Sequence, residues 1–303
     1  MRSSANWISR SRSWTSRCAV AGALVLAVGA PSAQTPPFEQ GLLWRIAKPG
    51  VPDSFAFGTI HIADPRVTIA KPVADALGRS HTLALESGGE VANAEVFELE
   101  QFEDGRRLEP LIGEEAFKRV RIELMAQDVP ERVIERMKPW AAMIKVGRAK
   151  ARSGDPGLDQ QLVAAARARR LKLMALEWVE EQIAAFDAVP LETQVALLKH
   201  VLADQAALEA SLDATIDAWL RGDLARLAQL NAGSHDRSAE LRRHYRRLTK
   251  HIIDDRSIVM HHRLILPLRA GRVFVAVGAL HLYGEKGLLA MIARDGYRVS
   301  RIY

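Results

Sequence analysis

The chain has 303 residues, of which 48% are hydrophobic and 26% charged, a composition typical of a globular protein large enough to bury one or two cores. Its formal net charge of +6 is concentrated at the N-terminus, because residues 1–33 contain four arginines and no acidic residue. The remaining 38 Lys and Arg residues against 36 Asp and Glu leave no basic excess that would favour nucleic acid as a partner.

Residues 1–33 have the pattern of a secretory signal peptide. A basic, serine-rich stretch precedes an apolar run over 18–30 that is shorter than a membrane-spanning helix needs, and cleavage is expected after Ala33. We therefore expect a periplasmic or secreted protein with no stable membrane span after cleavage; the alternative is an uncleaved N-terminal membrane anchor. Cys18 is the only cysteine, so the mature chain would have no disulfide, and any metal site must use His, Asp and Glu.

The mature chain opens with a predicted β-hairpin. Two strand patterns, residues 42–46 and 55–58, flank a Lys-Pro-Gly turn. The second strand runs into the motif Gly-x-x-His at 58–61. A helix is then predicted from Asp64, with Pro65 at its first position.

A third strand pattern, residues 82–86, ends in Glu86. Helical periodicity follows over about 91–266. One more strand pattern, residues 172–177, interrupts it and ends in the same Ala-Leu-Glu, with Glu177 as its last residue.

The segment 236–266 is long for a single helix, so we expect a bend near Asp254 and an end at Pro267. The C-terminal part then repeats the order strand, Gly-x-x-His, helix and adds a last strand: residues 272–277, 278–281, 284–294 and 297–302. Strands thus cluster at the two ends of the chain. The pattern predicts a mixed α/β (α+β) fold in which residues 34–303 form one domain, with a central sheet of N- and C-terminal strands and a large helical insertion.

Four chemically capable residues follow predicted strands: His61, Glu86, Glu177 and His281. In open α/β sheets, functional groups gather beyond the carboxyl ends of the strands. Two histidines and two carboxylates suit a divalent ion such as zinc, manganese or cobalt, which would activate a water molecule, while a glutamate that is not a ligand acts as general base. The glycine three residues before each histidine is expected to allow a sharp turn.

The motif itself is common by chance. A third match, Gly78 to His81, has no strand before it and is interpreted as a helix C-terminus. The alternative for the two motif histidines is a hydrogen-bonded residue at a strand end, and for each glutamate a carboxylate paired with an arginine. No His-Glu-x-x-His, no Gly-x-Ser-x-Gly and no glycine-rich phosphate loop occurs in the sequence.

In these residues the chain resembles the TraB/GumN family, which includes the Tiki proteases of animals. The resemblance spans about 42–303 and is carried by an ordered set of motifs: residues 42–44, 57–61, 85–86, 138–140, 157–159, 176–182, 274–282 and 284–288. It implies an α/β core related to erythromycin-esterase-like and ChaN-like proteins. It also implies metal-dependent hydrolysis in the bacterial envelope, with peptidase activity as one form.

Tiki members are described as metalloproteases that use the paired Gly-x-x-His histidines and a glutamate. By this resemblance His61 and His281 are expected to be metal ligands, and Glu86 a ligand or the general base. Arg256 occupies the place of a family arginine and is expected to orient a carboxylate or to polarise a substrate carbonyl. Ser257 stands where the family usually has Asn.

Glu177 and Asp159 are second-tier candidates for the same site. A peptide or a small molecule is the expected partner. The alternative function is a non-enzymatic periplasmic protein that binds a small molecule, haem or a peptide, which the ChaN relationship permits. An accessory role in envelope polysaccharide production is suggested by the GumN name alone.

Overall fold

The computed structural model of this chain describes residues 38–62, 64–87, 93–148, 157–203, 205–232 and 238–303. The signal peptide predicted at 1–33 lies outside the described residues. Among the helices in these ranges, none combines the length and the hydropathy that crossing a bilayer requires.

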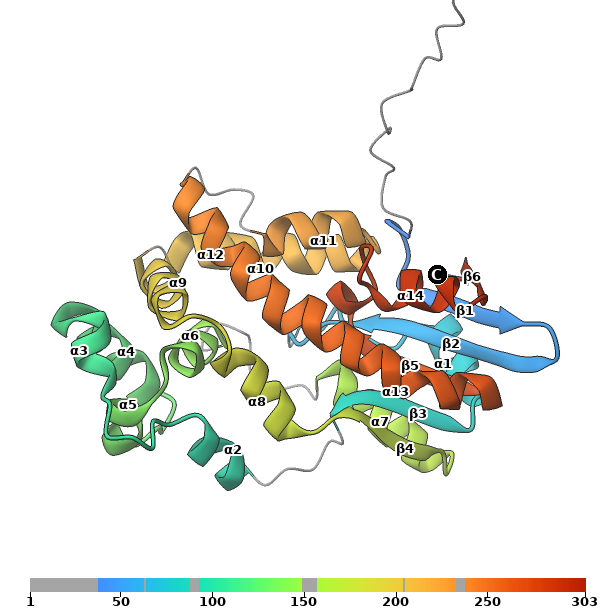
Figure 1. Cartoon of the computed structure of the whole chain (residues 1–303), viewed down its shortest axis with the longest axis horizontal. Helices are drawn as coiled ribbons and strands as arrows, with labels where there is room; N and C mark the ends of the chain where they lie inside the picture. Colours follow the sequence, from blue (N-terminus) through green and yellow to red (C-terminus); the bar gives the residue numbers. More distant parts are fainter. Residues whose placement is uncertain (1–37, 63, 88–92, 149–156, 204, 233–237) are drawn as a thin grey trace, which may run out of the picture. The chain divides into compact units, whose positions relative to one another are not determined.

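Six strands form one mixed sheet, as predicted, and they come from both ends of the chain with one contribution from the middle (Figure 1). In chain order they are β1 (Leu43–Lys48), β2 (Val51–Thr59), β3 (Thr82–Ser87), β4 (Lys172–Glu177), β5 (Val273–Gly278) and β6 (Arg298–Arg301). Their order across the sheet is β4-β3-β5-β2-β1-β6. The strands β4, β3, β5 and β2 are parallel, whereas β1 is antiparallel to β2, which confirms the hairpin, and to β6.

The C-terminal strand β5 occupies the middle of the parallel part. It pairs with β2 on one side, where Phe55 lies opposite Phe274, and with β3 on the other. Its residues Val273 to Val277 are all at least 98% buried. A continuous apolar run of this kind is what a parallel strand covered on both faces requires. The chain ends can therefore form the sheet only together, because β5 separates β2 from β3.

The helices lie mostly between β3 and β5 in the sequence. They are α1 (Lys71–Gly78), α2 (Asn93–Leu99), α3 (Leu108–Ile112), α4 (Glu114–Met125), α5 (Glu131–Arg136), α6 (Pro139–Arg148), α7 (Leu158–Ala168), α8 (Val179–Asp187), α9 (Leu191–Ala203), α10 (Gln205–Leu220), α11 (Leu224–Asn231), α12 (Ala239–Thr249), the π-helical turn η1 (Lys250–Asp255), α13 (Arg256–Ala270), the 3-10 turn η2 (Ala279–His281) and α14 (Leu288–Arg294).

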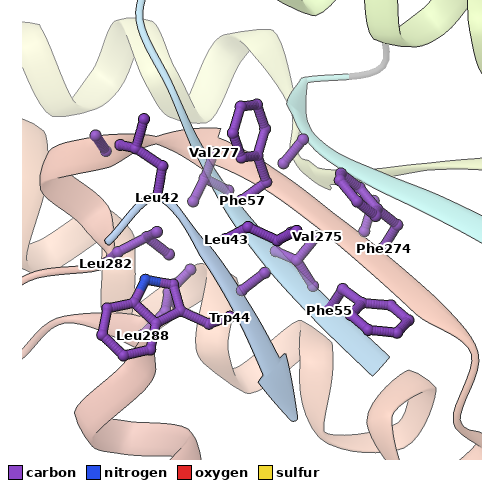
Figure 2. Packing of buried hydrophobic residues seen from close by; sticks show 14 of the residues in the cluster. Leu42, Leu43, Trp44, Phe55, Phe57, Phe274, Val275, Val277, Leu282 and Leu288 are labelled. Carbon is purple, nitrogen blue, oxygen red and sulfur yellow. The ribbon is translucent and has the colours of Figure 1, made fainter. Parts of the chain in front are cut away.

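Helices cover both faces of the sheet. In Figure 1, α13 crosses in front of the strands, and α1 and α7 lie behind them. The main core fills the space around the sheet, where side chains of β1, β2 and β5 converge with Leu282 and Leu288 (Figure 2). Trp44 and Phe57, both at most 4% exposed, belong to this core.

The helical insertion has a second core of its own, built by α3–α6, α8 and α9. Asp187 joins two of its helices, because its carboxylate accepts hydrogen bonds from Lys138 Nζ at 2.7 Å and from Trp140 Nε1 at 2.8 Å. The Trp140 ring also stacks on Phe186. The Lys-Pro-Trp motif at 138–140 therefore holds α6 against α8.

Three predicted helix boundaries are wrong, the first being the start of the C-terminal helix, which lies at Leu288 and not at residue 284. Asp64 does not start a helix: its carboxylate accepts hydrogen bonds from the backbone N–H and the side chain of Arg66, and this local turn competes with helix formation. The helix begins at Lys71 instead, with Pro72 in its first turn. Pro267 does not end α13, because it lies in the last turn and the helix continues to Ala270.

The predicted bend near Asp254 corresponds to the π-helical turn η1, which separates α12 from α13. A π-turn shifts the helical register, so the residues that follow it face in a new direction. Here the first residues after the turn are Arg256 and Ser257, which are both buried.

The glycine of the first Gly-x-x-His motif is needed for close packing, and the prediction of a sharp turn at this residue is wrong. Gly58 lies inside β2 without a left-handed φ, and a Cβ placed on it would lie 3.0 Å from both Cα and Cβ of Ala279. Ala279 belongs to the second Gly-x-x-His motif. The two motifs therefore touch through Gly58.

We expect Gly58→Ala to lower the free energy of unfolding by about 1–3 kcal/mol, the usual cost of overpacking a core. Gly78→Ala is the matched control from the third Gly-x-x-His match. Gly78 ends α1, and the nearest atom to an added Cβ is Arg169 Nε at 3.9 Å, so this change is expected to be neutral or slightly stabilising. Urea denaturation of both variants measures the difference, and equal stability of the two would contradict the packing explanation.

Candidate functional site

The carboxyl ends of the parallel strands lie at one edge of the sheet, and all six residues singled out in the sequence meet there. Glu86 belongs to β3, Glu177 ends β4, and His61 and His281 follow β2 and β5. The remaining two come from helices: Asp159 from the first turn of α7 and Arg256 from the first turn of α13.

Arg256 lies between the two glutamates. Its Nη2 is 2.7 Å from Glu86 Oε2 and 2.7 Å from Glu177 Oε2, and its Nε donates a further bond to Glu177 at 3.0 Å. The three side chains are 11%, 13% and 2% exposed, in the order Arg256, Glu86, Glu177. The expected pairing of a carboxylate with an arginine therefore holds for both glutamates. Because Arg256 binds Oε2 of Glu86, the other oxygen, Oε1, is directed away from Arg256.

The two glutamates have pKa values displaced in opposite directions. Burial opposes ionisation of Glu86, but His281, His61 and Arg256 outweigh it, and the pKa of Glu86 lies well below its ordinary value of 4.5. Burial raises the pKa of Glu177 above 4.5 in spite of the hydrogen bonds from Arg256. Glu86 is thus a stable anion, and a stable anion is a good ligand and a weak base.

His61 is held from one side by a carboxylate. Its Nδ1 lies 2.7 Å from Asp159 Oδ2, and its Nε2 lies 3.8 Å from Glu86 Oε1. The hydrogen bond to Asp159, followed by the interaction with Glu86, raises the pKa of His61 from 6.5 to about 10. The imidazole is half-exposed, so solvent and small molecules can reach it.

His281 is buried, and its tautomer follows from its hydrogen bonds. Ser257 Oγ donates to Ile253 O at 2.7 Å, so the same oxygen must accept from His281 Nδ1 at 2.9 Å. Burial lowers the pKa of His281 to about 4, which makes the ring neutral at pH 7. Its unprotonated Nε2 therefore faces Glu86 Oε1, 3.7 Å away. A lone pair directed at an anion is unfavourable unless a cation lies between them.

The glycine of the second motif makes room at this point. The Gly278 N–H donates to Glu86 Oε1. A Cβ on Gly278 would lie 3.1 Å from that oxygen and 3.6 Å from both His61 Nε2 and His281 Cδ2. The chain does turn directly after β5, into η2, as predicted, but with φ −49° at Gly278 this turn does not require a glycine. The absence of a side chain keeps open the space that both imidazoles and Glu86 border.

The donor set fits a divalent metal ion. Both imidazole Nε2 atoms lie within 4 Å of Glu86 Oε1, so they are at most 7.5 Å apart. Metal bonds to imidazole nitrogen and carboxylate oxygen are about 2.0–2.2 Å, which places donors that share one ion roughly 3–4 Å apart. Each Nδ1 is bound by an outer partner, as metal-ligating histidines require. In the described ranges no group of three His, Cys, Asp or Glu side chains is already close enough to hold a metal ion. His61, His281 and Glu86 would therefore have to move closer together when the ion binds.

The charges in this cluster are also unbalanced. Glu86, Glu177 and Asp159 carry three negative charges against the single permanent positive charge of Arg256. The proton on His61 compensates for one of the two excess charges. A divalent cation that replaces this proton would neutralise the cluster, which lowers the cost of burying the carboxylates.

Two cavities open beside the cluster. One, of about 550 Å³, is bounded mainly by α7 and α8, and the other, of about 420 Å³, mainly by α10, α11 and η1. His61, Glu86 and Arg256 line both. Each cavity has a size typical of a ligand site.

Sequence reasoning missed the roles of two residues. Ser257 was noted only for standing where Asn is usual, and Gly278 only as a turn residue. The position of Ser257 directly after Arg256 could have indicated that Ser257 belongs to the site. No feature of the sequence indicated that Gly278 borders both imidazoles. Asp159 was included through its motif, but its partner His61 is almost 100 residues away and was not predicted.

Comparison with protein families matches residues 42–301 to the TraB/PrgY/gumN family. No curated protein and no solved structure matches the chain.

In the metal-free protein we expect NMR titration of the ring nitrogens to give pKa values of about 10 for His61 and about 4 for His281. Asp159→Asn should lower the first value towards 6.5 and leave the second almost unchanged. The contribution of His61 to the free energy of unfolding is complete below pH 6.5 and is lost as the pH rises through 10. The contribution of His281 is complete above pH 6.5 and is lost as the pH falls through 4. Titration of His61 near 6.5 in the wild-type protein would contradict this description.

Proposed function

Because the chain belongs to the TraB/PrgY/gumN family over residues 42–301, we propose that it is a metal-dependent hydrolase that binds one zinc, manganese or cobalt ion through His61, His281 and Glu86. One observation carries the proposal: the two imidazole Nε2 atoms face the same carboxylate oxygen, while each Nδ1 has its own partner. That arrangement leaves two nitrogens and one oxygen available to a single ion.

The bound ion supplies a Lewis acid that polarises a carbonyl and makes water a nucleophile near neutral pH. Glu86 acts as a ligand, because its lowered pKa makes it a poor proton acceptor. Arg256 is a positioning residue: it holds Glu86 Oε2, so that Oε1 stays directed towards the histidines.

The chain also controls the protons at this site. Asp159 keeps the proton on His61 Nδ1, so His61 gives up its Nε2 proton when it becomes a ligand. Ser257 keeps the His281 proton on Nδ1, and His281 is therefore ready to bind without losing a proton. Metal binding should release close to one proton per chain at pH 7.

We expect the purified mature protein to hold close to one divalent ion per chain, and His61→Ala or His281→Ala to lose it, because each removes one of three ligands. His81→Ala is the matched control: His81 belongs to the third Gly-x-x-His match, is exposed, and has Arg272 as its partner. Elemental analysis after dialysis, with hydrolysis of a peptide and ester panel, measures the effect.

Absence of metal from the wild-type protein under loading with zinc, manganese and cobalt would contradict the proposal. So would full metal content in both His61→Ala and His281→Ala. A bound ion without turnover on any substrate of the panel would favour the alternative of a binding protein.

We also propose that the protein is exported to the periplasm or secreted, which rests on the sequence of residues 1–33. N-terminal sequencing of the protein from its native cells should find Gln34 as the first residue. A chain that keeps Met1 and sediments with membranes would instead support the N-terminal anchor.

A further inference from the structure

One of the two cavities beside the cluster, that of about 420 Å³, has a mostly apolar wall; we call it the α11 cavity. Its large apolar lining residues come from α10, α11, η1 and η2: Trp219, Leu227, Leu230, Ile252, Ile253 and Leu280. Among the described residues that line it, the charged side chains and the imidazoles all belong to the cluster. The cavity is therefore an uncharged, apolar space that adjoins the candidate metal ligands.

Thr59, the last residue of β2, lines the same cavity and carries a hydroxyl that has no partner. The residue is 1% exposed, and its Oγ1 makes no hydrogen bond within the part of the chain that the structure describes. A buried hydroxyl without a partner costs free energy, and a valine would fill the same volume without that cost. An unpaired hydroxyl at this place indicates that a bound ligand supplies the missing partner.

The register of the sheet places the Thr59 side chain beside the space that the cluster borders. Thr59 on β2 lies opposite Gly278 on β5. Residues that lie opposite each other on neighbouring strands direct their side chains to the same face of the sheet. On that face, a Cβ on Gly278 would lie 3.1 Å from Glu86 Oε1 and 3.6 Å from His61 Nε2. The Thr59 hydroxyl is thus one strand away from the oxygen that both imidazoles face.

Two other polar side chains of the cavity wall already have partners within the protein. Thr215 Oγ1 donates its one hydrogen to Ser211 O at 2.7 Å, and Asn231 Nδ2 donates to Thr249 Oγ1 at 3.0 Å. Thr215 therefore has the same hydroxyl as Thr59 in the same wall, but its hydrogen is not available to a ligand.

We propose that the α11 cavity holds the aliphatic acyl chain of a neutral ester, whose carbonyl oxygen accepts a hydrogen bond from Thr59 Oγ1. The Thr59 hydrogen requires an acceptor, and the apolar wall favours hydrocarbon directly next to that acceptor. The Glu86 anion disfavours a free carboxylate at the same place, so the acceptor belongs to an uncharged group. This inference rests on the proposed hydrolase function and names the substrate class of that site.

In the reaction, the bond between the carbonyl carbon and the ester oxygen breaks. The carbonyl carbon takes the hydroxyl of one water molecule, and the ester oxygen takes the remaining proton, which gives a carboxylic acid and an alcohol. Negative charge develops on the carbonyl oxygen when the water attacks, so the hydrogen bond from Thr59 strengthens in the transition state.

The test first measures binding to the metal-free protein by calorimetry. Two unreactive probes, methyl hexyl ketone and methyl propyl ketone, share the carbonyl and differ in chain length. Thr59→Val removes the hydroxyl and keeps the shape, whereas Thr59→Ser keeps the hydroxyl. Thr215→Val is the matched control, because the Thr215 hydrogen is already bound to Ser211 O. Metal-loaded protein is then assayed with the octanoyl and acetyl esters of one alcohol.

The wild-type protein should bind methyl hexyl ketone about tenfold or more tightly than methyl propyl ketone, because more hydrocarbon is buried. Thr59→Val should weaken the binding of methyl hexyl ketone about tenfold, since the hydrogen bond is lost. Its urea midpoint should stay the same or rise, because an unpaired buried hydroxyl is removed. Thr59→Ser should recover most of the affinity, and Thr215→Val should keep it.

Unchanged ketone binding in Thr59→Val would overturn the inference, as would equal affinity of the wild type for the two ketones or no binding of either. Ketone binding that depends on Thr59, without hydrolysis of either ester under zinc, manganese or cobalt, would refute the hydrolase and leave the acyl site standing. Hydrolysis of both esters with equal kcat/KM, unchanged in Thr59→Val, would do the reverse.

Discussion

The arrangement of the site depends on one buried guanidinium. Glu86 and Glu177 lie on neighbouring strands, and two buried carboxylates side by side repel each other and lose hydration. Arg256 compensates for both, because its planar fork of donors can reach two partners at once. The same contacts attach α13 to the sheet edge and set the direction in which Glu86 Oε1 points. The same side chain thus stabilises the sheet edge and helps to orient the Glu86 carboxylate.

The π-helical turn before α13 extends this arrangement to the second histidine. Arg256 and its neighbour Ser257 serve different strands, since Arg256 reaches β3 and β4 while Ser257 reaches His281 after β5. Both are tied back to the turn, where Ile252 O accepts from Arg256 Nη1 and Ile253 O accepts from Ser257 Oγ. π-turns are frequent at functional sites. Here the turn lets consecutive residues hold a glutamate and a histidine that lie more than 190 residues apart.

Much of this site could be predicted because parallel strands deliver their last residues to one edge. The apolar run of β5 and the two Ala-Leu-Glu endings were enough to bring His61, Glu86, Glu177 and His281 together. The glycine roles could not be predicted, because they depend on tertiary approaches: Gly58 packs against Ala279, and Gly278 borders Glu86 and both imidazoles. Residue type alone also gave a wrong helix start where another hydrogen bond competes with capping. Asp64 is a typical helix-capping residue, but its carboxylate accepts hydrogen bonds from Arg66 instead.

The central claim is that one divalent ion sits between the two motif histidines and Glu86. Crystals of the metal-loaded protein, measured at the absorption edge of the bound metal, test it most directly. The account predicts a single anomalous peak about 2.0–2.2 Å from His61 Nε2, His281 Nε2 and an oxygen of Glu86. A peak at any other set of side chains, or no peak in protein that was soaked with metal, would contradict it.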